Sequence, residues 1–500
     1  MQSTQPNIQT LGQLKAAGYK HQTVKEELRA NLITCLQNKE NPFEGIFGYD
    51  DTVIPDIEKA ILSKHNILLL GLRGQAKTKI ARQLTNLMNE WIPLVEGTEI
   101  NDDPFLPVTT SAKDKIALMG DDTPIIWMHQ SERYNEKLAT PDVSVADLIG
   151  DLDPIKAANL KLSLSDEKVI HYGIIPRSNK AIFVINELPD LQARIQVSLF
   201  NILQEGDIQI RGYKLRLPLD ILFIFTANPE DYTNRGSIVT PLKDRIESQI
   251  LTHYPNNIEI SAAITKQESN LSIAQKENVV VLDLVQTMIE EIAMAARKSE
   301  FVDQKSGVSA RLTIAANELL YASAERRSLV NNEKNTYARI SDVYGIIPAI
   351  TGKVELVYEG EQEGPYQVAI HLIGKAIRQL FTNYFPNPSD YKRSKVKKED
   401  PYKSIVNWFG QNNNTLHIGN HITDEEYMAQ LHKVDGLYYL VNTWLKCDSE
   451  KEQLLWMEFV LHGLAEFSLI SKRVLQTNST FSDILSSMMD MSVSDEEDYE

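Results

Sequence analysis

The sequence has few of the features that mark secreted or membrane proteins. Its 500 residues include two cysteines, Cys35 and Cys447, which are far apart and lack the spacing of a metal site. No apolar run approaches the length of a membrane span. The first residues also have no apolar core like that of a signal peptide. These absences lead us to expect a cytoplasmic protein without a membrane span.

Positive charge is scarce as well. The formal net charge is −17 at pH 7, from 51 Lys and Arg against 68 Asp and Glu. This balance argues against nucleic acid as the main partner, because phosphate backbones are bound by basic surfaces. The hydrophobic share of 42% and the charged share of 24% are ordinary for a globular chain. The length predicts roughly two to four domains.

Two catalytic signatures are missing or incomplete. The Gly-x-Ser-x-Gly turn of many serine hydrolases is not found in the chain. His417 and His421 have the i, i+4 spacing of a zinc-binding helix, but no Glu follows the first His, and Gly419 weakens a helix. We expect both histidines to be solvent-facing or packing residues.

The first half of the chain is predicted to have an α/β architecture. Residues 1–30 are polar, and residues 31–255 alternate between apolar runs and amphipathic helical segments. Three apolar runs lack long charged interruptions and predict buried strands of a largely parallel sheet. The candidate strands are residues 66–70, 125–129, 181–186 and 220–227, of which the last three are these buried runs.

The second half is predicted to be mostly helical. Apolar residues recur at helix spacing over residues 281–298 and 312–327. Prolines interrupt the pattern near residues 384–390, and a basic run at 392–398 follows, which is typical of a linker. The expected segments are a helical lid bundle at 256–345, an extension and linker at 346–390, a helical C-terminal region at 391–485 and an acidic disordered tail at 486–500.

The stretch Gly71-Leu-Arg-Gly-Gln-Ala-Lys-Thr78 lies between an apolar run and a helical segment. This strand–loop–helix setting is that of a phosphate-binding loop, whose backbone N–H groups wrap phosphate at a helix N-terminus. Lys77 can reach the β- and γ-phosphates, and Thr78 can offer a hydroxyl to Mg²⁺. Ala76 stands where glycine is usual. The expected nucleotide-binding residues of this loop are Gly71, Gly74, Gln75, Ala76, Lys77 and Thr78.

An ATPase also needs acidic residues at the end of a neighbouring strand. Residues 181–187 form such a strand, and they end in Asn186-Glu187. Glu187 is the candidate general base. Asn186 would hold a Mg²⁺-bound water through a neutral amide, which weakens metal binding. The alternative is a buried strand that ends in polar turn residues.

Three further residues complete an ordered set. Asn228 ends the next apolar run, where a polar side chain can hold the attacking water. Arg245 and Arg311 follow in the chain, and arginines at such places can neutralise phosphate charge in the transition state. Each residue alone is more typical of an ordinary surface position. It is their order along the chain, after the phosphate-binding loop, that indicates an ATPase site.

This set resembles the AAA+ ATPase family, in the branch of magnesium chelatase subunit I and the MoxR proteins. The resemblance covers residues from about 40 to about 330. It implies that Asn228 is the sensor-one residue, Arg245 the arginine finger and Arg311 the sensor-two residue. The loop with Ala76 is similar to the MoxR form. Ile46-Phe-Gly-Tyr-Asp50 resembles the segment that packs on adenine, which assigns Phe47 and Gly48 to the nucleotide site.

Three further segments support this branch. Residues 206–218 alternate apolar and polar side chains around Gly212-Tyr213 and predict a β-hairpin, which resembles the hairpin that the clade inserts before the sensor-one strand. Residues 173–180 resemble a chelatase segment that precedes the acidic strand. Residues 144–150 lie where the clade begins its helix-two insertion.

The resemblance implies an α/β P-loop NTPase fold with a parallel sheet, a helical lid bundle and an additional, mostly helical C-terminal region. It implies ATP and Mg²⁺ as ligands. Asn186 departs from the Asp expected at this position, and we therefore predict slow but real ATP hydrolysis. It also implies a homo-oligomer, a hexameric ring in which Arg245 completes the neighbour's site. The partner to be remodelled would be a protein with a von Willebrand factor A domain.

Two other functions stay open. One is a magnesium chelatase ATPase subunit that drives Mg²⁺ insertion into a porphyrin, although the long C-terminal region counts against it. The other is a nucleotide-gated scaffold that does not hydrolyse ATP, which Asn186 would favour. A sigma-factor-dependent activator is disfavoured because its Gly-Ala-Phe-Thr-Gly-Ala loop is missing, and a DNA motor is disfavoured by the net charge.

Overall fold

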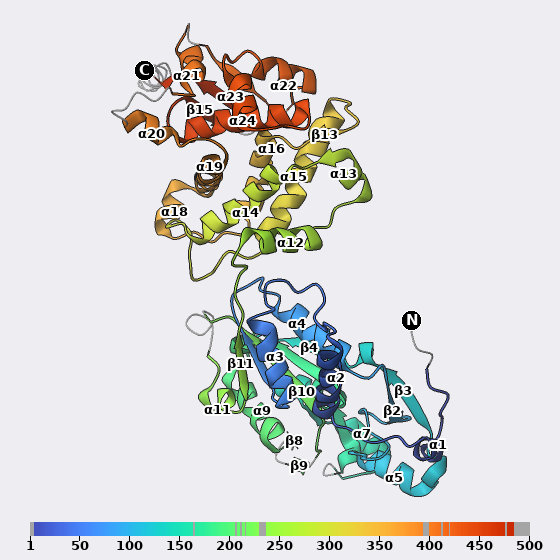
Figure 1. Cartoon of the computed structure of the whole chain (residues 1–500). Coiled ribbons are helices and arrows are strands. Elements are labelled where there is room, and N and C mark those ends of the chain that lie inside the picture. The colour runs from blue at the N-terminus through green and yellow to red at the C-terminus, as the bar shows by residue number, and fades with distance from the viewer. Residues whose placement is uncertain are drawn as a thin grey trace. The chain divides into compact units, whose positions relative to one another are not determined.

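The structure is a computed structural model of the chain. It describes residues 5–163, 166–205, 208–210, 213–215, 217–229, 237–393, 400–411, 414–419, 421–475 and 478–484. The chain forms two compact units, and the first ends at Tyr254 where the second begins at Pro255 (Figure 1). The acidic tail expected at 486–500 and the basic run at 394–398 lie outside the described residues.

A five-stranded sheet forms the centre of the first unit, in the order β11–β1–β10–β7–β4. Every pairing between these strands is parallel. The inner strands are apolar and almost completely buried, as strands covered on both faces must be. This sheet confirms the expected α/β fold of a P-loop NTPase. The strands are β1 (Ile67–Leu70), β4 (Tyr134–Leu138), β7 (Ala181–Asn186), β10 (Ile221–Ala227) and β11 (Ser248–Leu251).

Successive side chains of the inner strands enter two different cores. Ile182 and Val184 of β7 join one cluster, whereas Phe183 and Ile185 join the other, because neighbouring residues of a strand point to opposite faces. Helices α2 (Val24–Asn38), α3 (Val53–Leu62) and α4 (Lys77–Gln83) contribute to the first cluster. Helix α9 (Ala193–Glu205) contributes to the second. The sheet is therefore covered by helices on both faces (Figure 1).

The expectation that residues 125–129 form a buried strand of this sheet is wrong. They form β3 (Ile125–His129), which pairs antiparallel with β2 (Trp91–Val95) in a separate two-stranded sheet. Beyond Ile125 the strand is half-buried or exposed. The true neighbour of β7 is β4, an edge strand with the polar sequence Tyr-Asn-Glu-Lys-Leu. An edge strand tolerates such residues because only one side of it is paired.

Two smaller antiparallel strand pairs lie outside the central sheet. Strands β8 (Ile208–Ile210) and β9 (Tyr213–Leu215) pair antiparallel, which confirms the hairpin for its described residues; 211 and 212 lie outside them. After the short helix α6 (Val145–Leu148), strands β5 (Gly150–Leu152) and β6 (Ile170–Tyr172) form a second antiparallel pair. Between them lies α7 (Pro154–Leu160).

The second unit is built mainly of helices that share one core. A single cluster of buried residues runs from Val279 to Phe481, and all three segments predicted at 256–345, 346–390 and 391–485 contribute to it. The helices predicted at 281–298 and 312–327 are α14 and α15. The longest helices are α12 (Ile258–Glu268), α14 (Asp283–Arg297), α15 (Arg311–Val330), α19 (Pro365–Tyr384) and α24 (Glu450–Glu466).

The second unit also contains a three-stranded sheet, in the order β14–β16–β15. Its strands are β14 (Leu416–Ile418), β15 (Ser471–Leu475) and β16 (Asn478–Ser482). His417 lies in β14, where its Nδ1 is 3.0 Å from the Thr480 hydroxyl. In the part of the chain that the structure describes, no group of three or more His, Cys, Asp or Glu could hold a metal ion. No described helix is long and apolar enough to cross a membrane.

A buried salt bridge fixes helix α2 to the sheet. Arg133, directly before β4, is 1% exposed, and Glu27 of α2 is 3% exposed. Nη1 and Nη2 of Arg133 donate to the two carboxylate oxygens of Glu27, both at 2.7 Å, and Nε donates to the Lys180 carbonyl at 2.8 Å. Removing one partner leaves the other charge buried without compensation.

We expect Glu27→Ala to lower the free energy of unfolding of the first unit by about 3–5 kcal/mol, because Arg133 stays charged and buried. The double variant Glu27→Leu, Arg133→Met should lose much less. Lys15→Ala is the control, since it breaks the exposed Lys15–Asp121 pair and should cost less than about 1 kcal/mol. Urea denaturation of the full chain measures all three, and equal losses in the single and double variants would contradict the expectation.

Candidate functional site

The carboxyl ends of the inner strands meet at one edge of the sheet. Leu70, the last residue of β1, is level with Ala227, the last residue of β10, and the register of β10 with β7 continues to Phe225 and Ile185. The chain therefore brings three predicted elements to this edge. They are the loop at 71–76, Asn228 directly after β10, and Asn186-Glu187 at the end of β7. Ligands of open parallel sheets bind at such an edge.

The loop has the backbone of an anion-binding nest. Gly74 and Ala76 both adopt left-handed conformations, with φ of 73° and 57°. Ala76 is the residue directly before α4, at its N-cap. Left-handed residues in alternation turn backbone N–H groups toward a common anion, and the helix N-terminus adds positive partial charge. The left-handed conformation costs Ala76 about 1–2 kcal/mol, a cost that a glycine would avoid.

Lys77 lies inside this loop. Its side chain is buried, and Nζ donates to the carbonyl of Gly71 and, at 2.9 Å, to that of Leu72. Thr78, the next residue in the first turn of α4, is exposed. An ammonium enclosed by backbone, with a hydroxyl beside it, suits a nucleoside triphosphate and Mg²⁺. The residues of the loop therefore fit both ligands.

The side chains that hold the loop were missed by the sequence analysis. The Tyr254 hydroxyl donates to the Arg73 carbonyl at 3.0 Å. The Tyr49 hydroxyl lies 3.1 Å from the Gln75 carbonyl and 2.7 Å from the His253 carbonyl. The Thr252 hydroxyl donates to Oε1 of Gln75 at 2.7 Å. Burial raises the pKa of Tyr49 to about 12, so its phenol stays protonated as a donor at physiological pH.

Gly71 is the point where the loop packs most closely on this support. A Cβ on Gly71 would lie 2.0 Å from the Thr252 hydroxyl and 2.2 Å from Oε1 of Gln75. Both atoms belong to one buried hydrogen bond. An added methyl group would therefore have to displace one or both of these side-chain atoms.

We expect Gly71→Ala to destabilise the first unit by about 1–3 kcal/mol through overpacking and to abolish binding of an ATP analogue. Gly410→Ala is the matched control, because a Cβ there meets nothing within 4 Å. Thermal unfolding and fluorescence binding report the two effects. Wild-type values for both in Gly71→Ala would show that the close contact is unimportant.

The tips of β7 and β10 are joined by a residue that the sequence analysis also missed. The buried Thr226 hydroxyl donates to Oδ1 of Asn186 at 3.2 Å and accepts from the backbone N–H of Glu187 at 3.1 Å. Glu187 itself adopts a left-handed conformation with φ of 56°. Asn228 is 4% exposed. Thr226 thus orients both members of the Asn186-Glu187 pair.

Arg245 lies away from the phosphate-binding loop of its own chain. It follows α11 (Thr240–Lys243) and precedes β11, so it belongs to the amino edge of the sheet. Its Nε donates to Gln204 at 3.0 Å, and Nη1 donates to the Pro241 carbonyl at 2.7 Å. The guanidinium also lies 4.9 Å from the centre of the Phe200 ring. The fold therefore does not bring Arg245 to Lys77 within one chain.

The remaining predicted residues have different positions. Phe47 is 39% exposed between buried Phe43 and Tyr49, and Gly48 has φ of 77°. The Phe47 side chain is therefore accessible to solvent. In the same segment, the Gly45 carbonyl accepts from Nζ of Lys79 at 3.3 Å. Arg311 is the exposed first residue of α15 in the second unit. It is not among the residues that the first unit brings together.

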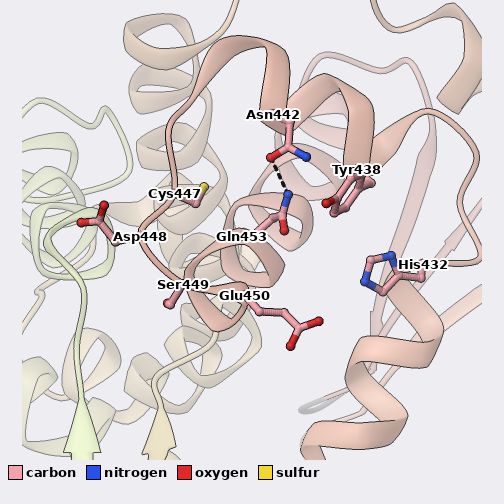
Figure 2. Close-up of a pocket in the computed structure, with 8 residues that line it drawn as sticks. All are labelled: His432, Tyr438, Asn442, Cys447, Asp448, Ser449, Glu450 and Gln453. Atoms are coloured by element: carbon pink, nitrogen blue, oxygen red, sulfur yellow. Dashed lines mark hydrogen bonds between the residues drawn. The ribbon is translucent and has the colours of Figure 1, made fainter.

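A pocket of about 700 Å³ lies in the second unit (Figure 2). Within it, Nε2 of Gln453 donates to Oδ1 of Asn442 at 2.6 Å. Asp448 and Glu450 would repel a phosphate, so the pocket does not suit a nucleotide. Its lining is His432, Tyr438, Asn442, Cys447, Asp448, Ser449, Glu450 and Gln453.

No protein-family model matches the chain, and no curated protein matches it. Among solved structures, it is similar to a candidate ATPase from Cytophaga hutchinsonii, with 17% identity over 72% of this chain and 98% of that one and a TM-score of 0.30. It is also similar to a structure of the BchI–BchD complex of magnesium chelatase, with 18% identity, coverages of 64% and 98%, and a TM-score of 0.33.

A third similar structure is NtrX from Brucella abortus in complex with ADP. The identity is 13% over 58% of this chain and 53% of that one, with a TM-score of 0.33. Identities and TM-scores this low carry no weight for function. Only the chain's own residues therefore bear on its function.

Proposed function

We propose that this chain is an ATPase of the AAA+ type that binds ATP and Mg²⁺ at residues 71–78. One observation carries the proposal: the buried Lys77 ammonium lies inside a left-handed loop at the same sheet edge as Glu187 and Asn228. The loop supplies N–H donors and positive charge, and the neighbouring strands supply a carboxylate and an amide. Phosphoryl transfer to water needs these groups.

Each residue has a distinct role in this proposal. The loop and Lys77 bind the β- and γ-phosphates, and Phe47 with Gly48 packs against the adenine. Thr78 and Asn186 would hold Mg²⁺, Asn186 indirectly through water, and the ion would supply charge neutralisation at the phosphate oxygens. Glu187 accepts a proton from the attacking water, and Asn228 orients that water. Thr226 keeps Asn186 and Glu187 in place.

The place of Arg245 supports a homo-oligomer, which we propose is a hexameric ring. Arg245 lies before β11, at the opposite edge of the sheet from its own loop, so a role at a phosphate would require the loop of a neighbouring subunit. There it would neutralise charge in the transition state. Arg311 is kept as the proposed sensor-two residue. Turnover would then remodel a partner protein, which we propose carries a von Willebrand factor A domain.

Two other functions have some support. A chelatase subunit that drives Mg²⁺ into a porphyrin would use the same nucleotide site. A non-hydrolysing scaffold is favoured by Asn186, whose amide oxygen accepts from Thr226 and carries no charge for Mg²⁺. Measurements of ATP turnover separate the scaffold from the two motors. A porphyrin-binding subunit among co-purifying partners would identify the chelatase.

We expect the purified protein to release phosphate from ATP slowly, and Glu187→Gln to reduce this release by about 100-fold or more because the general base is lost. The variant should still bind ATP. Lys77→Ala is the matched variant that should lose binding as well. A phosphate-release assay beside an equilibrium binding assay measures both. Equal background release from wild type and Glu187→Gln would favour the scaffold.

We expect Asn186→Asp to lower the Mg²⁺ concentration that gives half-maximal turnover by about tenfold, since a carboxylate holds the metal-bound water more tightly. Asn38→Asp adds the same charge at an exposed position at the end of α2 and should leave that concentration unchanged. Turnover measured across a Mg²⁺ titration tests both variants. An unchanged midpoint in Asn186→Asp would remove Asn186 from the metal site.

A further inference from the structure

The carbonyl groups of the phosphate-binding loop are divided between two sets of partners. The carbonyls of Gly71 and Leu72 accept from Lys77. The carbonyl of Arg73 accepts from Tyr254, and the carbonyl of Gln75 lies within hydrogen-bond distance of the Tyr49 hydroxyl. In a planar trans peptide, the N–H of the next residue points opposite to the carbonyl. The two tyrosines therefore direct the N–H groups of Gly74 and Ala76 away from themselves.

Those two N–H groups belong to the left-handed residues of the nest. A peptide that rotates by half a turn would present a carbonyl oxygen to the phosphate in place of an N–H. Such a rotation would turn attraction into repulsion at that position. The orientation of the Arg73 and Gln75 carbonyls thus matters for phosphate binding, although neither carbonyl would touch the phosphate.

Tyr49 contacts the end of the first unit, and Tyr254 is its last residue. Thr252, His253 and Tyr254 follow β11, and Tyr254 is the last residue before the second unit begins. The Tyr49 hydroxyl lies within hydrogen-bond distance of the carbonyls of both Gln75 and His253. The rings of Tyr49 and His253 pack edge to face with their centres 5.0 Å apart. Thr252 binds Gln75 through its hydroxyl and Leu70 through its backbone N–H at 2.9 Å. Every residue of 252–254 is therefore bonded to the loop, to β1 or to Tyr49.

We propose that Tyr49 and Tyr254 are positioning residues that couple the shape of the phosphate-binding loop to residues 252–254, through which the chain enters the second unit. This inference rests on the proposed nucleotide site. A nucleotide that orders the loop then also orders residues 252–254. By thermodynamic reciprocity, the factor by which nucleotide binding favours the ordered form of residues 252–254 is also the factor by which that ordered form raises nucleotide affinity.

Tyr254→Phe tests the coupling with little disturbance of packing. The ring stays, and only the hydroxyl that holds the Arg73 carbonyl is removed. Tyr254 is half-buried, so water can replace the lost donor and the fold should persist. Tyr49→Phe is the companion variant at the buried position. Tyr439→Phe is the control, because its side chain is 76% exposed on α23 (Leu437–Trp444).

The experiment measures hydrogen exchange of the full chain with and without a non-hydrolysable ATP analogue. In wild type, the analogue should protect residues 71–83 and also residues 252–254, at the end of the first unit. In Tyr254→Phe, protection of 71–83 should remain at saturation and protection of 252–254 should be lost. Affinity should fall by about fivefold, the equivalent of one neutral hydrogen bond, with KM for ATP rising by a similar factor and kcat within about twofold.

The outcomes separate the two proposals. Wild-type protection of 252–254 in both tyrosine variants would overturn the coupling and leave the nucleotide site intact. Equal effects in Tyr439→Phe would also overturn it, because they would not depend on the loop hydroxyls. No protection of 71–83 in wild type would overturn the proposed function, and this inference with it.

Discussion

The parallel register of β1, β10 and β7 is the constraint on which the rest of the first unit depends. It places the carboxyl ends of the three strands at one edge, although the residues there are separated by long stretches of sequence. The pairing is stabilised by two apolar cores, which the strands enter from opposite faces. Lys77 and Glu187 lie at the same edge of the sheet because of backbone pairing that involves neither side chain.

A second level of order fixes the groups at that edge. Thr226 holds the pair at the end of β7, and the tyrosines with Thr252 hold the loop after β1. These supporting residues donate to or accept from backbone and amide groups. Preorganised groups of this kind need no rearrangement when charge develops on a substrate, which is how enzymes use fixed dipoles. The chemistry assigned to Lys77 and Glu187 thus depends on neutral neighbours.

The sequence predicted the parts of this fold whose signals are local. β1, β7 and β10 are short apolar runs that end in polar residues, and the loop has a recognisable spacing. β4 was missed and β3 misplaced, because an edge strand lacks the apolar pattern of a buried one. The residues that hold the loop could not be predicted from the sequence, because they lie far from it along the chain. Tyr49 lies 26 residues from Gln75, and Tyr254 lies 181 residues from Arg73.

The continuous core of the second unit limits how the protein can be divided. Buried side chains from α14 and α15 join the same cluster as those of α19 and α24. A fragment that ended near residue 345 would expose the apolar faces of its remaining helices to water, and exposed faces of that kind promote aggregation. The residues after 345 therefore complete the same hydrophobic core as the helices before them.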